Sequence, residues 1–417
     1  MGLMTGTTLQ GLKNTYSSAL YSYFRVTNLE EAYEEFIKDP TKPPLFHYSD
    51  NMSLAVINKR LKKLHEILAG LDPANQAEIA FVEWRLAESL ILQEFRKIYE
   101  NGGDISPQKV NKYIADQMEL YGDINLEIFG GVIRWLRVLA NRRGPEYVKV
   151  MAQIQKRVGE YPDHILYVPK EATFLHYKRL FADGFPELHA VLSRVRRAEQ
   201  YSQEELVEVF EKALSAVDAT QRGWRVVISS GGANVISAKY RQKVIIGSHY
   251  QPSSTPRLKQ VVAHEIGAHV QRAISDTAGK KLASFDENDE GLAVVVEQLY
   301  GHKFSYKRAQ RYLAVCLAVG ADGQKRNFSE VYDILWRAFY IASGDKKGAK
   351  KRAFYETARA FRGGIPAVPG MVYIKDKIYL EGNLIVWEKL EENLLGQREF
   401  RQLFKGHNDK VAKEIVP

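Results

Sequence analysis

Apolar side chains in the first half of the chain recur at the spacing of amphipathic helices. One such stripe, with steps of three and four residues, is formed by Leu54, Ile57, Leu61, Leu64 and Leu68. Side chains at these steps lie on one face of a helix. The same pattern predicts helices over 76–100, from Pro107 onward and over about 124–141, and Ser202 with Glu205 is a capping-box pair that opens another.

The pattern changes after residue 220, where short β-branched runs alternate with turn residues. The runs 224–229, 234–238 and 243–247 predict a small antiparallel sheet. The third run directly precedes a helix expected from about Arg257. As an edge strand it would be able to hold an extended peptide by backbone pairing, and a plain structural strand is the alternative.

Helical periodicity returns from about 290 to 361. The runs 372–374 and 378–380 are candidates for a late β-hairpin. A helical region, a small sheet and a helical remainder follow one another along the chain. This order is typical of the α+β class.

Composition places the chain among ordinary globular proteins, since it has 417 residues, of which 45% are hydrophobic and 26% charged. The single cysteine, Cys316, excludes an intrachain disulfide and any zinc cluster built from cysteines. The first 20 residues are polar and do not resemble a secretory signal, and no apolar run is long enough to span a membrane. The expected location is therefore cytoplasmic.

The net charge is +9, and basic clusters occur at 59–63, 194–197 and 346–352. Such a surplus attracts acidic partners, for example an acidic peptide or protein C-terminus, a membrane surface or nucleic acid, but it is also typical of a solvated helix face. No zinc knuckle, RNA-binding aromatic signature or Gly-rich phosphate loop is present. A nucleic-acid partner is therefore not expected.

Candidate chemistry is concentrated at 264–269, which reads His-Glu-Ile-Gly-Ala-His. Neutral imidazole is a good zinc ligand, and a neighbouring carboxylate can act as general base. His264 and His269 stand at i and i+5, which are about 140° apart around a regular α-helix. Both can face one metal only if the helix is locally widened into a π-type turn, a distortion that Gly267 would ease.

A hydrolytic zinc site needs a third protein ligand. The segment Glu-Gly-Leu-Ala at 290–293 begins another helical pattern, so a returning helix can present Glu290 to the two histidines. The resulting His₂Glu set is the one that thermolysin-like enzymes use. Asp286, Glu287 and Asp289 are further carboxylates nearby. In the alternative interpretation, the histidines belong to the core and the acidic run to a solvated loop.

Several segments together resemble the microtubule-associated tyrosine carboxypeptidase family and its bacterial relatives. The central segments are 264–269, where Ala268 takes the place of the family's usual Thr, and 290–293. Others are Arg-Gly at 362–363 and Lys-Asp-x-x-Tyr-Leu-x-Gly at 375–382, with upstream segments at 44–48 and 120–123. The resemblance spans residues 40 to 390, approximately.

The resemblance implies a metallocarboxypeptidase that removes a C-terminal tyrosine or similar aromatic residue from a peptide or protein. By motif match, one Zn²⁺ per chain is held by His264, His269 and Glu290, and Glu265 is the general base. The fold is then expected to be a mostly helical, zincin-like metallopeptidase with the small antiparallel sheet before the helix that carries the histidines.

An exopeptidase that acts on C-termini needs a cation for the terminal carboxylate, ideally a bidentate arginine. Arg362 is the first candidate because it lies in a matching family segment, and Arg257 and Lys239 are alternatives. Tyr373 or Tyr379 is a candidate donor to the oxyanion. Arg272, close to His269, is interpreted as a brace for the site; each of these cations has an alternative interpretation as an ordinary surface or helix-end charge.

The predicted organisation is an N-terminal extension over 1–40, a helical region over 41–200, a catalytic region over 201–400 and a C-terminal tail over 401–417. Two rival functions remain open. One is a non-catalytic zinc-binding regulatory or peptide-binding protein with the same fold, against which the intact Glu265 argues. The other is a metal-independent helical interaction protein that uses its basic clusters.

Overall fold

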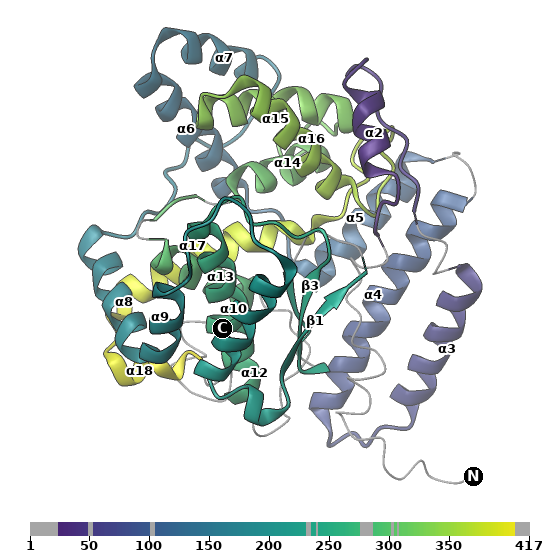
Figure 1. Ribbon diagram of the computed structural model, residues 1–417. Helices are drawn as coiled ribbons and strands as arrows, with labels where there is room; N and C mark the ends of the chain where they lie inside the picture. The colour runs from purple at the N-terminus through teal and green to yellow at the C-terminus, as the bar shows by residue number, and fades with distance from the viewer. Residues whose placement is uncertain are drawn as a thin grey trace. The chain divides into compact units, whose positions relative to one another are not determined.

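The structure is a computed structural model that describes residues 24–48, 53–100, 105–230, 235–238, 241–275, 287–301, 304–306 and 308–404. It is mostly helical, with 67% helix and a small three-stranded mixed sheet (Figure 1). The α+β class is therefore confirmed. Lys239 and Asp286 lie outside the described residues.

The described residues form two compact units. One unit contains 167–305 and 382–404, and the other contains 24–166 and 306–381. Units defined by packing need not coincide with functional regions, so the predicted catalytic region at 201–400 remains a prediction. The histidine motif belongs to the first unit.

The second unit is built from helices. Its α-helices include α2 (Leu29–Phe36), α3 (Leu54–Ala69), α4 (Gln76–Glu100), α5 (Pro107–Tyr121), α6 (Leu126–Arg143), α7 (Pro145–Gln155), α14 (Ala309–Val319), α15 (Phe328–Ser343) and α16 (Lys346–Phe361). The stripe that begins at Leu54 predicted α3 correctly, and its Ile57, Leu61 and Leu64 are buried. The expected helices at 76–100, after Pro107 and near 124–141 are α4, α5 and α6.

The predicted hairpin over 372–380 is wrong. A 3₁₀-helix over Ile374–Lys377 leads directly into α17 (Ile378–Asn393). The backbone groups that a hairpin would pair have other partners, since Tyr373 N–H donates to the Ala360 carbonyl and Ile374 N–H to Gln117 Oε1, both at 2.9 Å.

The first unit surrounds the sheet and the motif with helices. They are α8 (Glu171–Gly184), α9 (Pro186–Ser193), α10 (Gln203–Ala216), α11 (Thr255–Val262), α12 (Gln271–Ser275), α13 (Glu287–Tyr300), α18 (Gln397–Gln402) and a 3₁₀-turn over Thr220–Arg222. The capping box at Ser202 and Glu205 is confirmed at the start of α10, where each side chain bonds the other residue's backbone N–H.

The sheet contains β1 (Arg225–Ser229), β2 (Val235–Ala238) and β3 (Lys243–Gly247) in the order β1-β3-β2. β2 and β3 are antiparallel, as expected, but β1 and β3 are parallel. The prediction of a purely antiparallel sheet is thus wrong, because the chain returns past β2 and places β3 in the centre. The proposed edge-strand role of 243–247 is wrong for the same reason, since β3 is paired on both sides.

One buried apolar cluster fills the first unit and includes side chains of α8, α9, α13 and α17. Helix α13 is tied to α17 by a buried network in which Gln298 bonds Asn383 and accepts a hydrogen bond from the Trp387 indole at 2.6 Å. Gly291 lies at the closest approach of these two helices. A β-carbon at Gly291 would be 2.3 Å from the carbonyl carbon of Gly382, so only glycine fits there.

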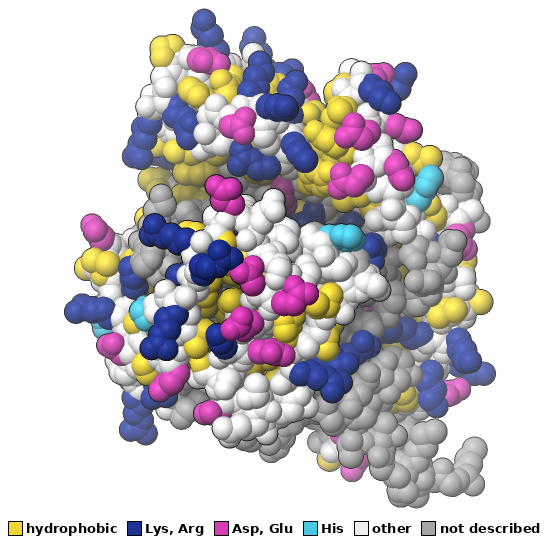
Figure 2. Space-filling model, in the orientation of Figure 1, with side chains coloured by type: hydrophobic (Ala, Val, Ile, Leu, Met, Phe, Trp, Pro, Cys, Tyr) yellow, Lys and Arg dark blue, Asp and Glu magenta, His cyan; other side chains and the backbone are white. Residues whose placement is uncertain are grey.

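The basic run at the start of α16 faces solvent. Lys346, Lys347, Lys350, Lys351 and Arg352 are all exposed. Figure 2 shows further Lys and Arg side chains gathered over the α6, α7, α15 and α16 region of the same view. In the described part of the chain, no helix is long and apolar enough to cross a bilayer.

We expect Gly291→Ala to destabilise the first unit by about 1–3 kcal/mol, because the added methyl group meets backbone that cannot rotate away. Thermal unfolding compared with wild type measures this. Gly70→Ala is the matched control, since its β-carbon would have its nearest neighbours at 3.6 and 3.7 Å, ordinary contact distances. Equal unfolding temperatures for the two variants would contradict the close α13–α17 contact.

Candidate functional site

The two histidines lie on a continuous helical stretch that is regular at its ends and widened in the middle. Ser254 caps its start by accepting a hydrogen bond from Arg257 N–H at 3.3 Å. Helix α11 is followed directly by a π-helix over Ala263–Val270 and then by α12. The predicted π-type distortion is therefore confirmed, and the wider turn brings side chains at i and i+5 to the same face.

Gly267 contributes to this turn through its small size. It is absent from the positive-φ residues, so its backbone does not use a conformation reserved for glycine. A β-carbon there would lie 3.3 Å from Leu188 and 3.4 Å from Phe181 and Val296. The prediction that Gly267 is needed for its backbone freedom is therefore corrected. The small residue instead allows the π-helix to pack closely against α8, α9 and α13.

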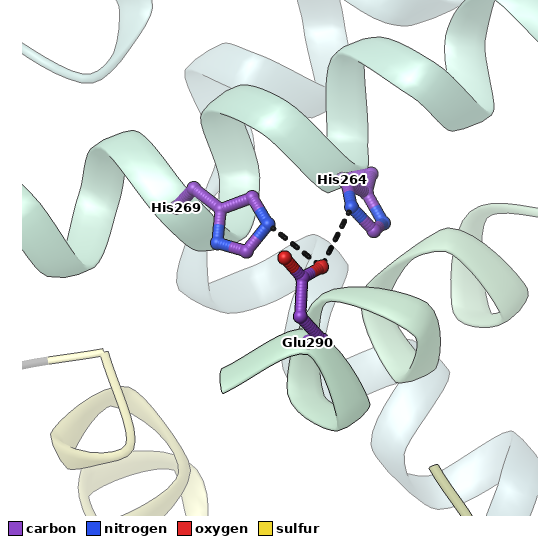
Figure 3. Close-up of side chains that lie close together, drawn as sticks. All are labelled: His264, His269 and Glu290. Atoms are coloured by element: carbon purple, nitrogen blue, oxygen red, sulfur yellow. Dashed lines mark ion pairs between the residues drawn. The ribbon is translucent and has the colours of Figure 1, made fainter. Parts of the chain in front are cut away.

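Helix α13 supplies the third member of the site. Asp289 forms a 2.7 Å ion pair with Arg272 of α12, which fixes the first turn of α13 beside the motif helix. Arg272 therefore holds α13 next to the helix that carries the histidines, in agreement with its interpretation as a brace. The Asp289 carboxylate is paired with Arg272. Glu290, the next residue along the helix, is buried and points to the histidines (Figure 3).

The side chains of His264, His269 and Glu290 converge on one point. Glu290 Oε2 lies 3.6 Å from His264 Nε2 and 3.4 Å from His269 Nε2. One potential ligand atom from each residue lies within 4.8 Å of the others. All three residues are at least nine-tenths buried, at 7%, 7% and 8% exposure.

This donor set fits a divalent metal ion. Ligand atoms about 2.0–2.1 Å from a tetrahedral zinc are about 3.3 Å apart, close to both Glu290–histidine separations. Glu290 Oε2 is buried and has no hydrogen-bond partner among the described residues. A buried carboxylate oxygen that makes no hydrogen bond is costly, and a cation shared with the two imidazole nitrogens would satisfy it. The residues can therefore hold a metal of the zinc type.

A model of one protein family, described as microtubule-associated tyrosine carboxypeptidase, matches residues 159–413. This match covers more than half of the chain and includes His264, His269 and Glu290, the triad described above. The chain belongs to the microtubule-associated tyrosine carboxypeptidase family. Membership implies an enzyme of the carboxypeptidase class. No curated protein and no solved structure matches the chain.

Within this family member, Glu265 is held in place by strand β2. Ser237 N–H donates to Glu265 Oε2 at 2.9 Å, and Ser237 Oγ donates to the Glu265 carbonyl at 3.1 Å. Glu265 itself is buried. The two hydrogen bonds fix both the carboxylate and the backbone of a residue next to His264.

Arg257, a predicted substrate contact, forms an ion pair with Glu297 in α13. Glu297 is 1% exposed, and its other oxygen lies 3.4 Å from His264 Nδ1. The Arg257 guanidinium is therefore paired with a carboxylate that lies behind the His264 ring.

The other residues that were predicted to contact the substrate, in the segments that resemble the family, lie in the second unit. Arg362 Nη2 donates to Asp376 at 3.0 Å, beside Arg359, which also pairs with Asp376. The Tyr379 ring packs under the Arg308 guanidinium, 5.0 Å from its centroid. The Tyr373 hydroxyl shares a 2.9 Å hydrogen bond with Tyr121. Their assigned roles toward substrate remain predictions.

Sequence reasoning missed three residues near the triad. Ser237 of β2 bonds Glu265, and Tyr250 in the loop after β3 is close enough for Glu265 and Glu297 to influence its pKa, but no sequence spacing signals either residue. Glu297 follows Glu290 by seven residues, two turns of helix, and this periodicity was a usable signal. The Tyr250 hydroxyl is buried and has no partner in the described part of the chain.

Electrostatic interactions couple the ionisation of His264, His269 and Glu290. Burial alone would lower the pKa of His264, but the Glu290 and Glu297 carboxylates raise it to about 9. Burial would raise the pKa of Glu290, and the two histidines hold it well below its usual value. A buried histidinium–carboxylate pair is therefore the favoured state without a metal at neutral pH.

We expect this pairing to make the stability of the metal-free protein depend on pH. Because the pKa of His264 is raised from 6.5 to about 9, its contribution is fully present below pH 6.5 and is lost as pH rises through 9. Thermal unfolding of chelator-treated protein between pH 6 and 10 measures it. The loss should be smaller in Glu290→Gln, and identical pH profiles for both proteins would contradict the pairing.

Proposed function

We propose that this chain is a zinc-dependent carboxypeptidase that hydrolyses the C-terminal peptide bond of peptides or proteins and releases tyrosine or another aromatic residue. The observation that carries the proposal is the convergence of two histidines and Glu290, across a π-helix, in a member of a carboxypeptidase family. A zincin-like fold is part of the same proposal.

His264, His269 and Glu290 are the proposed ligands of one zinc ion. Bound zinc supplies a Lewis acid that polarises a carbonyl and makes water a nucleophile at neutral pH. Three protein ligands leave the further coordination position that hydrolysis needs. The buried ligand atoms support this assignment.

Glu265 is the proposed general base. Its Oε2 accepts the Ser237 N–H, so the carboxylate is held in a fixed orientation and its other oxygen remains for proton transfer. The carboxylate takes a proton from the attacking water and later delivers it to the leaving amine. Its position beside His264 in the sequence and on the π-helix supports this role.

Tyr250 is the proposed donor to the developing oxyanion. Its hydroxyl is buried without a partner among the described residues, and it belongs to the loop that joins β3 to α11. Burial raises its pKa well above the usual value, Arg257 lowers it, and Glu265 and Glu297 raise it. The hydroxyl therefore stays protonated near the base and is able to donate.

Arg362 remains the proposed receptor for the substrate's terminal carboxylate, with Arg257, Lys239 and Tyr379 as the other candidates. The proposed substrate is an acidic peptide or protein C-terminus, which the exposed basic run of α16 supports by charge. A cytoplasmic location also remains a prediction. The rival function is a non-catalytic zinc-binding protein of the same fold.

We expect purified wild type and Glu265→Gln each to bind about one zinc per chain, whereas only wild type releases tyrosine from a peptide that ends in tyrosine. Loss of the base should reduce kcat/KM by about 10²–10⁴-fold. Metal analysis and amino-acid release measure the two properties. Glu208→Gln, an exposed substitution on α10, is the control that should retain full activity.

A C-terminally amidated version of the same peptide separates exopeptidase from endopeptidase action, because a carboxypeptidase requires the free carboxylate. Its cleavage at an equal rate would contradict the C-terminal assignment. Zinc binding without turnover of any peptide would favour the non-catalytic rival. Absence of zinc even after reconstitution would return both histidines to the core.

We expect Tyr250→Phe to lower kcat by about 10–10³-fold while the zinc content stays at the wild-type level, since only an oxyanion donor is lost. Steady-state kinetics with the tyrosine-ended peptide tests this. Tyr177→Phe is the matched control, because the Tyr177 hydroxyl bonds the backbone of Leu390 and Leu395 and should affect stability alone. An unchanged kcat in Tyr250→Phe would remove Tyr250 from the reaction.

A further inference from the structure

The imidazole of His264 lies between two carboxylates of the same helix. Its Nε2 faces Glu290 Oε2 at 3.6 Å, and its Nδ1 faces Glu297 Oε2 at 3.4 Å. Glu290 and Glu297 are two helical turns apart on α13, so they project from one face. His264 is thus oriented from both ends of its ring.

Glu297 is a buried charge with a defined set of neighbours. It is 1% exposed, and its Oε1 is bound by the Arg257 guanidinium. A buried carboxylate is tolerated when it is paired, so Arg257 accounts for its presence behind the site. The remaining oxygen, Oε2, is the one that faces the histidine ring.

A neutral histidine donates from one ring nitrogen and accepts at the other. If Nδ1–H points to Glu297, the lone pair of Nε2 points to the position shared with His269 and Glu290. The 3.4 Å separation is slightly longer than a hydrogen bond, and a small rotation of the ring closes it. Histidines that bind metals are commonly oriented by such a second carboxylate.

We propose that Glu297 is a positioning residue that fixes the tautomer and orientation of His264 for metal binding, and that Arg257 in turn holds Glu297. The inference rests on the proposed zinc site but goes beyond it, because it assigns a function to two residues outside the ligand set. Among the described residues neither His264 Nδ1 nor His269 Nδ1 makes a hydrogen bond, but the Glu297 carboxylate lies 3.4 Å from His264 Nδ1, so the proposal concerns His264.

The test measures zinc affinity directly, by competition with a chromophoric chelator. Glu297→Gln keeps the size of the side chain and removes its charge, and we expect it to weaken zinc binding by about 10–100-fold. Glu356→Gln is the matched control. It breaks a bidentate pair with Arg311, with oxygens 2.7 and 2.9 Å from the guanidinium, in the second unit, and should leave zinc affinity unchanged.

Glu297→Asp guards against misfolding, because it retains a negative charge that the long Arg257 side chain can follow, while the carboxylate is drawn away from the His264 ring by one methylene. We expect a loss of zinc affinity in this variant as well, of at least about tenfold. Wild-type affinity in a folded Glu297→Gln or Glu297→Asp protein would overturn the positioning role while leaving the zinc site intact. Failure of wild type to bind zinc would instead reject the proposed function.

Discussion

The widened turn between Ala263 and Val270 is the constraint on which the site depends. A regular helix would send His264 and His269 to different faces, and no arrangement of the remaining residues would then bring them to Glu290. A π-turn is rare because it gives up the favoured geometry of the α-helix. Here it is compensated by burial, since every residue of the turn is buried and Gly267 admits close packing by Leu188, Phe181 and Val296.

The charges around this turn form a series of ion pairs between two helices that run in opposite directions. Three acids of α13 each face a basic or imidazole group of the motif helix: Glu297 faces Arg257, Glu290 faces the two histidines, and Asp289 faces Arg272. The outer pairs flank the central one, so the Glu290 carboxylate lies between two ion pairs that fix how the helices are aligned. Removing one partner of such a pair leaves an uncompensated buried charge, which is strongly destabilising.

Much of this arrangement could be predicted from the sequence because it follows local periodicity. The i and i+5 spacing of His264 and His269 predicted the π-turn. The helical pattern that begins at Glu290 predicted that a returning helix would bring this carboxylate to the two histidines. The parallel pairing of β1 with β3, and the helical conformation of 374–380, could not be predicted in the same way. They depend on long-range partners, such as Gln117 for the backbone of Ile374. Ser237 bonds Glu265 from a strand that is distant in sequence, which leaves no spacing signal, and Tyr250 is likewise linked to Glu265 only through the fold. The roles of Arg362 and Tyr379 toward substrate rest on family resemblance.

The close approach of Gly291 to Gly382 has a mechanical consequence. Two backbones in direct contact have no side chain between them that could change rotamer and absorb a displacement. Any movement of α17 at this point is therefore transmitted to α13, and Glu290 is only one residue away. The position of this carboxylate is thus set by rigid contact as well as by charge, because α17 limits how far the start of α13 can move.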